Sequence, residues 1–312
     1  PLNIKPFLEE KDYSIDFSEV KGQALGKRGL EIAAAGGHNI ILIGSPGSGK
    51  SMLAKRMITI LPSMSEEEII ESTKIYSVAG ELNSKKPIIN HRPFRSPHHT
   101  SSLTSIIGGG KRIKPGEISL ASNGVLLLDE LAEFPRSILE SLRQPLEDGL
   151  VSITRAQYRV EFLSKFQLLA TSNPCFCGNY YEGASCTCTQ HEVNKYMKKL
   201  SGPIMDRIDI HIEMRRLSED ELMNSVEAEN SNIIKERVIK ARKIQRKRYN
   251  SDLLNGNLGQ KEIKKYCKIS DEDKEYFKNA MRIMEISARG YDKILKVART
   301  IADLDESKDI KK

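Results

Sequence analysis

The chain has 312 residues, of which 29% are charged and 39% hydrophobic, and it carries a formal net charge of +7 at pH 7. This composition excludes a disordered chain, and the length allows a large core with a second, smaller domain. No apolar run approaches the about 20 residues of a transmembrane helix, and no signal segment is evident, so we expect a cytoplasmic protein without a membrane partner. The positive charge is compatible with a polyanionic partner without requiring one.

The first strong motif follows residues 40–43, an apolar and β-branched run that predicts a short buried parallel strand. Residues 44–51 fit the pattern G-x-x-x-x-G-K-[ST], and helical spacing continues over residues 51–61. Strand, loop and helix in this order predict a phosphate-binding loop, whose N–H groups surround the β-phosphate of a nucleoside triphosphate. Lys50 supplies a cation, and the Ser51 hydroxyl is placed to bind Mg²⁺. The loop residues predicted to bind ATP are Gly44, Pro46, Gly47, Ser48, Gly49, Lys50 and Ser51.

Helices are predicted on both sides of this motif, over residues 24–35 and from the capping-box pattern of residues 65–68 onward. Residues 78–117 then show no clean periodicity, which indicates an insertion of loops and short strands. This insertion contains three histidines, His91, His98 and His99. They are open to interpretation as a metal site, but we favour ordinary polar contacts within the insertion.

The second strong motif is residues 124–130, an apolar strand pattern that ends in two adjacent carboxylates. We expect Asp129 to hold Mg²⁺ beside Ser51, and Glu130 to polarise the water that attacks the γ-phosphate. The alternative is that an Asp-Glu pair simply ends a strand, which the preceding phosphate loop makes the weaker interpretation. A helix is predicted next, over residues 136–146.

Residues 151–162 alternate in apolar character about a polar tip, which predicts a β-hairpin with Arg155 and Arg159 close to its turn. The next apolar run, residues 166–172, predicts another core strand. Asn173 follows it directly. This residue either reaches the γ-phosphate or its attacking water, or merely starts a turn, and spacing alone does not separate the two.

Four of the five cysteines form two C-x-C pairs separated by eight residues: Cys175, Cys177, Cys186 and Cys188. Four thiolates in a reducing compartment suit one tetrahedral Zn²⁺ site, which would clip the loop after Asn173. His191 is a candidate to replace one ligand. Because C-x-C is tighter than the commoner C-x-x-C spacing, reduced free thiols and a redox or iron–sulfur role stay open as alternatives.

Arg207 lies between two acids directly before a strand predicted over residues 210–214, an arrangement that is often a surface ion pair. From residue 217 the pattern is wholly helical, and composition places a domain boundary there, with domains of residues 1–215 and 216–312. The predicted helices cover residues 218–226, 230–249, 271–287 and 291–304.

The second of these helices carries eight lysines and arginines, Lys235, Arg237, Lys240, Arg242, Lys243, Arg246, Lys247 and Arg248. A solvated helix face is the interpretation that we favour, and a contact with nucleic acid or another subunit is the alternative.

Several runs across the chain are far more specific than a nucleotide motif: residues 31–39 (EIAAAGGHN), 92–100 (RPFRSPHHT), 114–120 (KPGEISL), 173–178 (NPCFCG) and 298–304 (ARTIADL). With the phosphate loop, they resemble the ComM/YifB competence-protein family, a magnesium-chelatase-related branch of the AAA+ ATPases. The departures are Phe176 in place of the usual proline and Ser51 in place of the commoner threonine, and neither should disturb the chemistry.

This resemblance implies an α/β fold of the P-loop NTPase (AAA+) type, with a three-layer αβα core and a parallel sheet, followed by a small all-helical lid domain. It also implies a Lon-protease-like domain ahead of these residues, which fits the start at Pro1.

The resemblance further implies roles around the γ-phosphate. Asn173 resembles sensor 1, and Arg207 matches the arginine finger that is offered to the ATP of a neighbouring subunit. Arg289 matches sensor 2 of the lid, with Arg299 as the less favoured candidate, so Arg289 is expected to complete the site of its own chain. The segment that lies against the adenine ring has its counterpart in Val20, Gly22 and Gln23.

Similar proteins act as hexameric ring motors on DNA and promote branch migration during natural transformation. Residues 151–162 occupy the place of a hairpin that projects into the ring pore. The residues expected to contact the DNA backbone, without sequence preference, are Lys111, Arg112, Lys114, Arg155 and Arg159. Pairing of these residues with acids across a subunit boundary is the alternative.

The expected function is therefore an ATP-driven motor, with Mg²⁺ and structural Zn²⁺, that acts as a homo-oligomeric ring on single-stranded or branched DNA. A chelatase-type subunit that remodels a protein complex for metal insertion is the alternative, and it has no evident need for the thiolate loop or the basic hairpin. A regulatory nucleotide-binding module is disfavoured because the hydrolytic set is complete, with Lys50, Asp129, Glu130 and Arg207.

Overall fold

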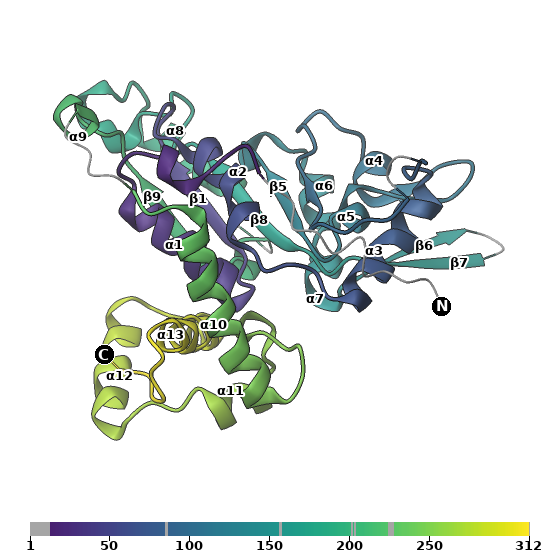
Figure 1. Cartoon of the computed structure of the whole chain (residues 1–312). Coiled ribbons are helices and arrows are strands. Elements are labelled where there is room, and N and C mark those ends of the chain that lie inside the picture. The colour runs from purple at the N-terminus through teal and green to yellow at the C-terminus, as the bar shows by residue number, and fades with distance from the viewer. Residues whose placement is uncertain are drawn as a thin grey trace.

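A computed structural model describes residues 13–84, 87–155, 158–200, 202, 204–223 and 228–311. Its centre is a five-stranded sheet in which all neighbouring strands run parallel, in the order β2-β5-β8-β1-β9 (Figure 1). These strands are β2 (Phe94–Arg95), β5 (Val125–Leu128), β8 (Gln167–Ser172), β1 (Ile40–Gly44) and β9 (Ile210–Met214). The expected α/β fold with a parallel core sheet is confirmed.

The apolar run of β1 is buried on both faces, as expected for the centre of a parallel sheet. Ile40 and Leu42 point to one core, and Ile41 and Ile43 to the other. The first core lies under α1 (Ala24–Gly36), α2 (Lys50–Ile60) and the beginning of α10 (Ser231–Tyr249). The second core includes residues of α6 (Arg136–Ser141) and α8 (Gln190–Leu200). The molecule is therefore layered as helix, sheet and helix.

The segment between β1 and β5 contains α3 (Glu66–Ala79) and the predicted insertion. The insertion is built from short pieces: α4 (Leu103–Ile107), the strand pair β3 (Gly108–Gly109) and β4 (Lys114–Pro115), and α5 (Glu117–Leu120). These pieces confirm the expectation of loops and short strands.

The helix predicted over residues 136–146 is two helices, α6 and α7 (Arg143–Asp148). Pro145 explains the break, because its ring clashes with the carbonyl four residues earlier, at Ser141, where α6 ends. The expected hairpin follows as the antiparallel pair β6 (Leu150–Arg155) and β7 (Tyr158–Leu163). It projects away from the sheet in Figure 1, and its tip, residues 156–157, is outside the described residues.

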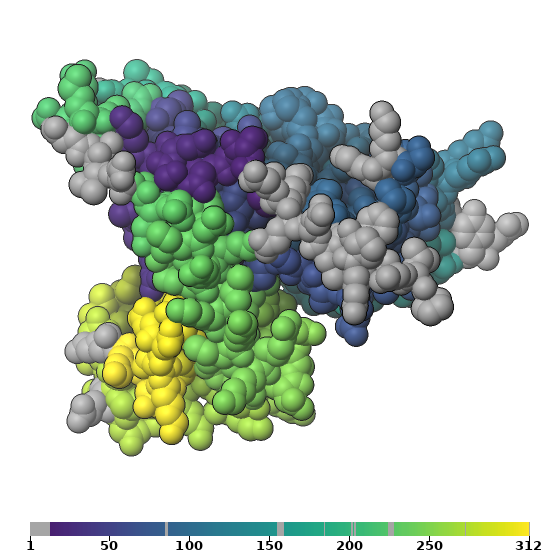
Figure 2. Space-filling view, in the orientation of Figure 1, coloured from purple at the N-terminus to yellow at the C-terminus, as the bar shows by residue number. Residues whose placement is uncertain are grey.

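The C-terminal helices form a second body below the first in Figure 2. Besides α10 they are η6 (Asn255–Asn257), α11 (Gln260–Tyr266), α12 (Asp271–Ile283) and α13 (Ala288–Leu304). We call residues 250–311 the helical lobe. Its small core contains Leu258, Ile263 and Leu295. Before α10 lies α9 (Glu219–Met223), and the end of the helix predicted over residues 218–226 falls outside the described residues.

The first half of α10 does not belong to the helical lobe. Ile234, Val238 and Ala241 are buried in the same core as Leu30 and Leu53, under the sheet. Packing therefore places the change from one body to the other within α10, later than the boundary that composition suggested near residue 215. None of the described helices has both the length and the apolar character needed to cross a membrane.

The basic face of α10 is less solvated than expected. Arg237 pairs with Glu31 and Glu229, while Arg242 donates to the carbonyl oxygen of Ala34. In the last turns of α10, Arg246 pairs with Asp252 and Arg248 pairs with Asp303. Arg237, Arg242 and Arg248 therefore hold α10 to its own chain, which corrects the solvated-face interpretation for these residues. The side chain of Arg246 is 67% exposed, and Lys240, Lys243 and Lys247 are exposed too, in agreement with that interpretation.

Candidate nucleotide site

The phosphate loop lies between β1 and α2, at the carboxyl edge of the sheet. Gly47 and Gly49 adopt φ angles of 82° and 86°, a backbone region that favours glycine. Lys50 turns back over the loop, where its Nζ donates to the carbonyl oxygens of Gly44 at 2.5 Å and Ser45 at 2.9 Å. Burial lowers the pKa of Lys50, while the charges of Asp129 and Glu130 oppose that shift. The predicted order of strand, loop and helix is present.

Asp129 is held in position by contacts from α2 and β8. It follows β5, and its Oδ1 accepts a hydrogen bond of 2.9 Å from the Ser51 hydroxyl. The same Oδ1 accepts from the Thr171 hydroxyl on β8, and Thr171 Oγ1 in turn accepts from the Glu130 backbone N–H at 3.1 Å. A hydroxyl and a carboxylate oxygen side by side are suitable ligands for Mg²⁺. Sequence reasoning identified Ser51 and Asp129 but missed Thr171.

Asn173 lies next to Lys50, as its place after β8 predicted. Lys50 Nζ donates to Asn173 Oδ1 at 3.3 Å. The contact arises because β1 and β8 are parallel neighbours, so their carboxyl ends meet at one edge of the sheet. Asn173 is therefore in reach of the position that a γ-phosphate would take above Lys50.

Glu130 points out of the sheet edge, with 58% of its side chain exposed and a φ of 58°. His99 faces it, with Nδ1 at 3.8 Å from Glu130 Oε2, and packs edge-on against Phe134. The His98 ring lies 4.1 Å from the His99 ring. The favoured interpretation of these histidines is ordinary polar contacts. The sequence around them carries no signal that predicts the contact of His99 with Glu130.

The segment before α1 also reaches the loop. Gln23 Nε2 donates to the carbonyl oxygens of Ser48 at 3.0 Å and Arg215 at 2.8 Å, whereas Val20 is buried in the main core. Arg216 lies on the other side, with Nε donating to the carbonyl oxygen of Pro46 at 2.8 Å. Sequence reasoning missed Arg216, although its place two residues after β9 was an available signal.

Arg207 lies at the opposite edge of the sheet. It ends η5 (Met205–Arg207), just before β9, and the amino end of β9 pairs with the amino end of β1. Its backbone carbonyl accepts from Asn39 Nδ2 at 2.9 Å, and its guanidinium pairs with Glu147 at the end of α7. The length of β1 therefore separates Arg207 from the phosphate loop of its own chain.

Arg289 is also on the Arg207 side. It is exposed in the first turn of α13, and Lys293, one turn later, donates to the carbonyl oxygens of Met205 and Ile208. The resemblance predicts that Arg289 completes the site of its own chain. The structure does not bring Arg289 to the phosphate loop of that chain.

Arg299, the second candidate for that role, is buried. It pairs with Asp303 and donates to the carbonyl oxygens of Ser307 and Lys308, so all its described contacts are within the helical lobe.

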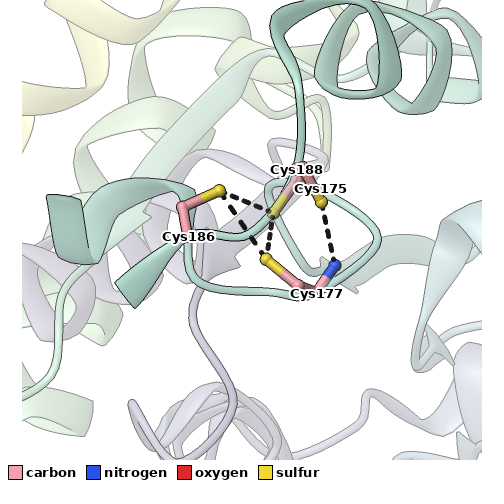
Figure 3. A group of neighbouring side chains, drawn as sticks. All are labelled: Cys175, Cys177, Cys186 and Cys188. Carbon is pink, nitrogen blue, oxygen red and sulfur yellow. Dashed lines mark hydrogen bonds between the residues drawn. The ribbon is translucent and has the colours of Figure 1, made fainter. Parts of the chain in front are cut away.

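The four cysteines of the predicted metal loop lie together (Figure 3). The Sγ atom of Cys175 is 3.4 Å from that of Cys177 and 3.9 Å from that of Cys186, and the latter two are 3.6 Å apart. A tetrahedral Zn²⁺ with Zn–S bonds of about 2.3 Å separates its ligands by about 3.8 Å. All four Sγ atoms, that of Cys188 included, lie within 4.8 Å of one another.

Local electrostatics favour a thiolate at one of the four cysteines, whereas burial raises the pKa of Cys175 and the pKa values of Cys186 and Cys188 are also raised. Backbone N–H groups of Asn179 and Thr187 lower the pKa of Cys177 to about 5, which favours a thiolate. His191 is exposed on α8 and is not among the ligand atoms that lie together. The loop also touches the nucleotide site, because a Cβ at Gly178 would lie 2.6 Å from Pro46 Cδ. The donor set fits one structural Zn²⁺ beside the phosphate loop.

The predicted DNA contacts lie on the insertion and the hairpin. Lys111 and Arg112 are exposed in the turn between β3 and β4, and Lys114 donates to the carbonyl oxygen of Ala79 at 3.0 Å. Arg159 pairs with Glu161 on the same strand at 2.7 Å, and the side chain of Arg155 is outside the described residues. The two elements touch, since the Gly108 backbone lies against Ile153.

The phosphate loop and the carboxylates after β5 lie together at one edge of the sheet. Comparison with known families shows which proteins this chain is similar to. The family model described as "Magnesium chelatase, subunit ChlI" matches residues 16–222, and the model of the ChlI C-terminal region matches residues 228–312. The chain belongs to the magnesium chelatase family. In this family of AAA+ ATPases the ligands of the loop are ATP and Mg²⁺.

Members of this family with curated sequences include YifB of Escherichia coli strain K12, 45% identical over 94% of the chain, and Competence protein ComM of Haemophilus influenzae, 44% identical over 93%. The expected ComM/YifB resemblance is confirmed. The chain spans 57% of the length of each of these relatives. A DNA replication licensing factor, mcm6 of Dictyostelium discoideum, is 23% identical over 58% of the chain, which spans 17% of its length.

Proposed function

We propose that this chain hydrolyses ATP as part of a homo-oligomeric ring, such as a hexamer, and uses the energy to move DNA. The observation that carries the proposal is the division of the nucleotide site between two edges of the sheet. Lys50, Asp129 and Glu130 gather at the carboxyl edge, whereas Arg207 lies at the amino edge. A subunit arranged in this way presents half of a site at each end and is completed by copies of itself.

Within one subunit, the proposed roles follow from the contacts. Ser51 and Asp129 hold Mg²⁺, Lys50 neutralises the phosphate oxygens, and Asn173 orients the γ-phosphate or its attacking water. Glu130, exposed at the edge, polarises that water. In-line phosphoryl transfer needs little more than this positioning and charge.

The neighbouring subunit supplies the remaining cations. We assign Arg207 to the γ-phosphate of the next subunit's ATP, and we assign Arg289 to the same neighbouring site, because α13 begins beside Arg207. A cation delivered in trans makes hydrolysis depend on assembly. This assignment replaces the earlier one, in which Arg289 served its own chain.

DNA is the proposed substrate of the motor. The projecting β6–β7 hairpin and the neighbouring β3–β4 turn present Lys111, Arg112, Lys114, Arg155 and Arg159. Support comes from the printed names of two relatives, a competence protein and a replication licensing factor. The ComM/YifB resemblance favours branch migration of recombination intermediates in the cytoplasm as the process served. A structural Zn²⁺ on the four thiols completes the proposal.

A DNA-stimulated ATPase assay tests the function directly. We expect slow turnover by the protein alone, and faster turnover and ring formation when single-stranded or forked DNA is added at low salt. Lys50→Ala should abolish turnover in both conditions, and Arg155→Ala should reduce the degree of stimulation by DNA. Arg136→Ala is the matched control, since Arg136 forms an exposed pair with Glu140 on α6.

Unchanged turnover and unchanged sedimentation on adding DNA would refute the DNA motor. Retained hydrolysis in that experiment would favour the other function considered above, a chelatase-type subunit that remodels a protein complex.

A further inference from the structure

The turn that carries Arg207 is held from two directions. On one side is the segment before β1, where Asn39 Nδ2 donates to the Arg207 carbonyl and the Asn39 carbonyl accepts from the Asp209 N–H, each at 2.9 Å. On the other side is α13, whose Lys293 Nζ donates to the carbonyl oxygens of Ile208 at 2.9 Å and Met205 at 3.3 Å. The two carbonyls that accept hydrogen bonds from Lys293 therefore lie on either side of Arg207.

A second link joins α13 to the same turn. His38 is fully buried, with Nδ1 3.2 Å from Asp209 Oδ2 and Nε2 2.7 Å from the Thr300 hydroxyl. Thr300 is on α13, two turns after Lys293. Two polar contacts on one helix thus fix its position relative to the turn.

The helix itself is packed into the helical lobe. Leu295 is part of the lobe core, and Asn255 Nδ2 donates to both Thr300 and Asp303. Elsewhere a cavity of about 840 Å³ lies between the lobe and the larger body, lined by Leu254 and Lys296 on one side and Glu147 on the other. The lobe also meets the larger body where Gly256 lies against the backbone of Gly36 and Gly37. The α13 contacts described above are the ones that reach the turn of Arg207.

We propose that Lys293 is a positioning residue for Arg207, through which the helical lobe of one subunit sets the cation offered to the ATP of the next. The proposal rests on the proposed function, in which Arg207 acts in trans. It extends that function by giving the lobe a role in passing the state of one subunit to its neighbour.

Physically, Lys293 acts through backbone geometry. Its ammonium group donates to the carbonyls of Met205 and Ile208, on either side of Arg207. Removing it takes away their charged donor and leaves only the Ile208 N–H at 3.2 Å from the Met205 oxygen and His211 Nε2 at 3.3 Å from the Ile208 oxygen among the described contacts. The turn then relaxes, and the guanidinium shifts relative to the site that it serves. A displacement of about 1 Å in a catalytic group lowers turnover by about 100-fold.

The first test is steady-state ATPase kinetics of Lys293→Met, which keeps the length of the side chain and removes the donor. We expect kcat to fall by about 10- to 100-fold with the KM for ATP nearly unchanged, because the phosphate loop is at the other edge of the sheet. Lys293→Arg should recover part of the turnover. Lys296→Met is the matched control, since Lys296 donates within the lobe, to the Gly256 carbonyl at 3.1 Å.

The second test separates action on a neighbour from action on the same chain. Lys293→Met subunits are mixed with inactive Lys50→Ala subunits, which still carry an intact Arg207. If Lys293 works through Arg207, turnover per Lys293→Met subunit should rise as Lys50→Ala subunits are added, as it should for Arg207→Ala in the same mixture. Turnover that stays flat or falls would overturn the proposal, because it places the defect in the subunit's own site.

The single substitution Arg207→Ala separates a test of the proposed composite site from a test of the proposed role of Lys293. Wild-type turnover by Arg207→Ala would refute the proposed composite site. Loss of turnover by Arg207→Ala together with wild-type kcat for Lys293→Met would refute only the positioning role of Lys293.

Discussion

Thr171 shows how much of the nucleotide site depends on a single hydroxyl. It is 1% exposed, donates to the carboxylate of Asp129 and accepts from the backbone N–H of Glu130. The residue proposed to hold Mg²⁺ and the residue proposed to polarise water are therefore set by the same side chain on the neighbouring strand. Phosphoryl transfer needs both in place at once.

Thr171→Val tests this dependence, because valine keeps the shape and removes the hydroxyl. We expect a loss of about 1–3 kcal/mol of unfolding free energy from the unpaired groups, and a fall in kcat larger than the rise in KM for ATP. Urea unfolding and steady-state kinetics measure the two effects. Thr171→Ser keeps the hydroxyl and should retain most of the turnover, and a Thr171→Val enzyme with wild-type kcat would contradict the role assigned here.

Residues of the site differ in how far sequence could predict them. Lys50 was predictable from the phosphate-loop motif. Asp129 and Asn173 were predictable because each directly follows a strand pattern, and parallel strands bring their ends to one edge. Thr171 and His99 were not, since their contacts depend on which strands are neighbours and on how the insertion folds over Glu130. Such pairings carry no local signal.

At the scale of elements, the cysteine loop acts on the phosphate loop. Gly178 lies against Pro46, so the shape of the cysteine loop limits where the phosphate loop can sit.

The break between α6 and α7 and the arginine contacts of α10 are two further features of single elements, and they differ in how well the sequence predicts them. Pro145 was visible in the sequence, whereas the pairing of Arg237 with Glu31 and of Arg248 with Asp303 joins distant segments and was not.

Removal of the proposed zinc should therefore impair nucleotide binding. We expect freshly purified protein to contain one equivalent of Zn²⁺, and Cys186→Ser to lose it, with a lower melting temperature and a higher KM for ATP. Elemental analysis, thermal unfolding and kinetics measure these effects. Cys267→Ala, in the helical lobe, should keep the metal. Metal-free wild-type protein would rule out the zinc assignment.

The helical lobe has its own critical group in Asp303, which is fully buried and pairs with Arg248 and Arg299. Asp303→Leu should lower the unfolding free energy by about 3–5 kcal/mol, because two guanidinium groups lose a buried partner. Urea unfolding measures the change. Asp305→Asn, which removes an exposed partner of Arg28, should change stability by less than about 0.5 kcal/mol, and equal effects of the two substitutions would contradict this account.

At the scale of the whole molecule, a site divided between two edges links nucleotide state to assembly. ATP held between Lys50 of one subunit and Arg207 of another joins the two. The phosphate-loop half follows from local sequence patterns and the Arg207 half from the family resemblance, but the separation of the halves along β1 required the sheet order. Assembly is therefore expected to be strongest when ATP is bound and not yet hydrolysed.

Glu130→Gln should trap that state, because the amide binds ATP normally but does not polarise water. We expect sedimentation velocity with ATP to show a larger oligomer for Glu130→Gln than for Lys50→Ala, which lacks the phosphate contact. Adding Arg207→Ala to Glu130→Gln should reduce the oligomer. Equal sedimentation of all three proteins would contradict a nucleotide-bridged interface.

The path of α10 determines where this polypeptide can be divided. Its first half covers apolar side chains of α1 and α2, and its second half is bound to the helical lobe. A fragment that stops at Met214 would uncover Leu30, Leu53 and Met57 and should aggregate, whereas one that continues to Tyr249 keeps them covered. To express the two bodies as separate polypeptides, the chain should be divided after α10, because the larger body then keeps the helix that covers its apolar side chains.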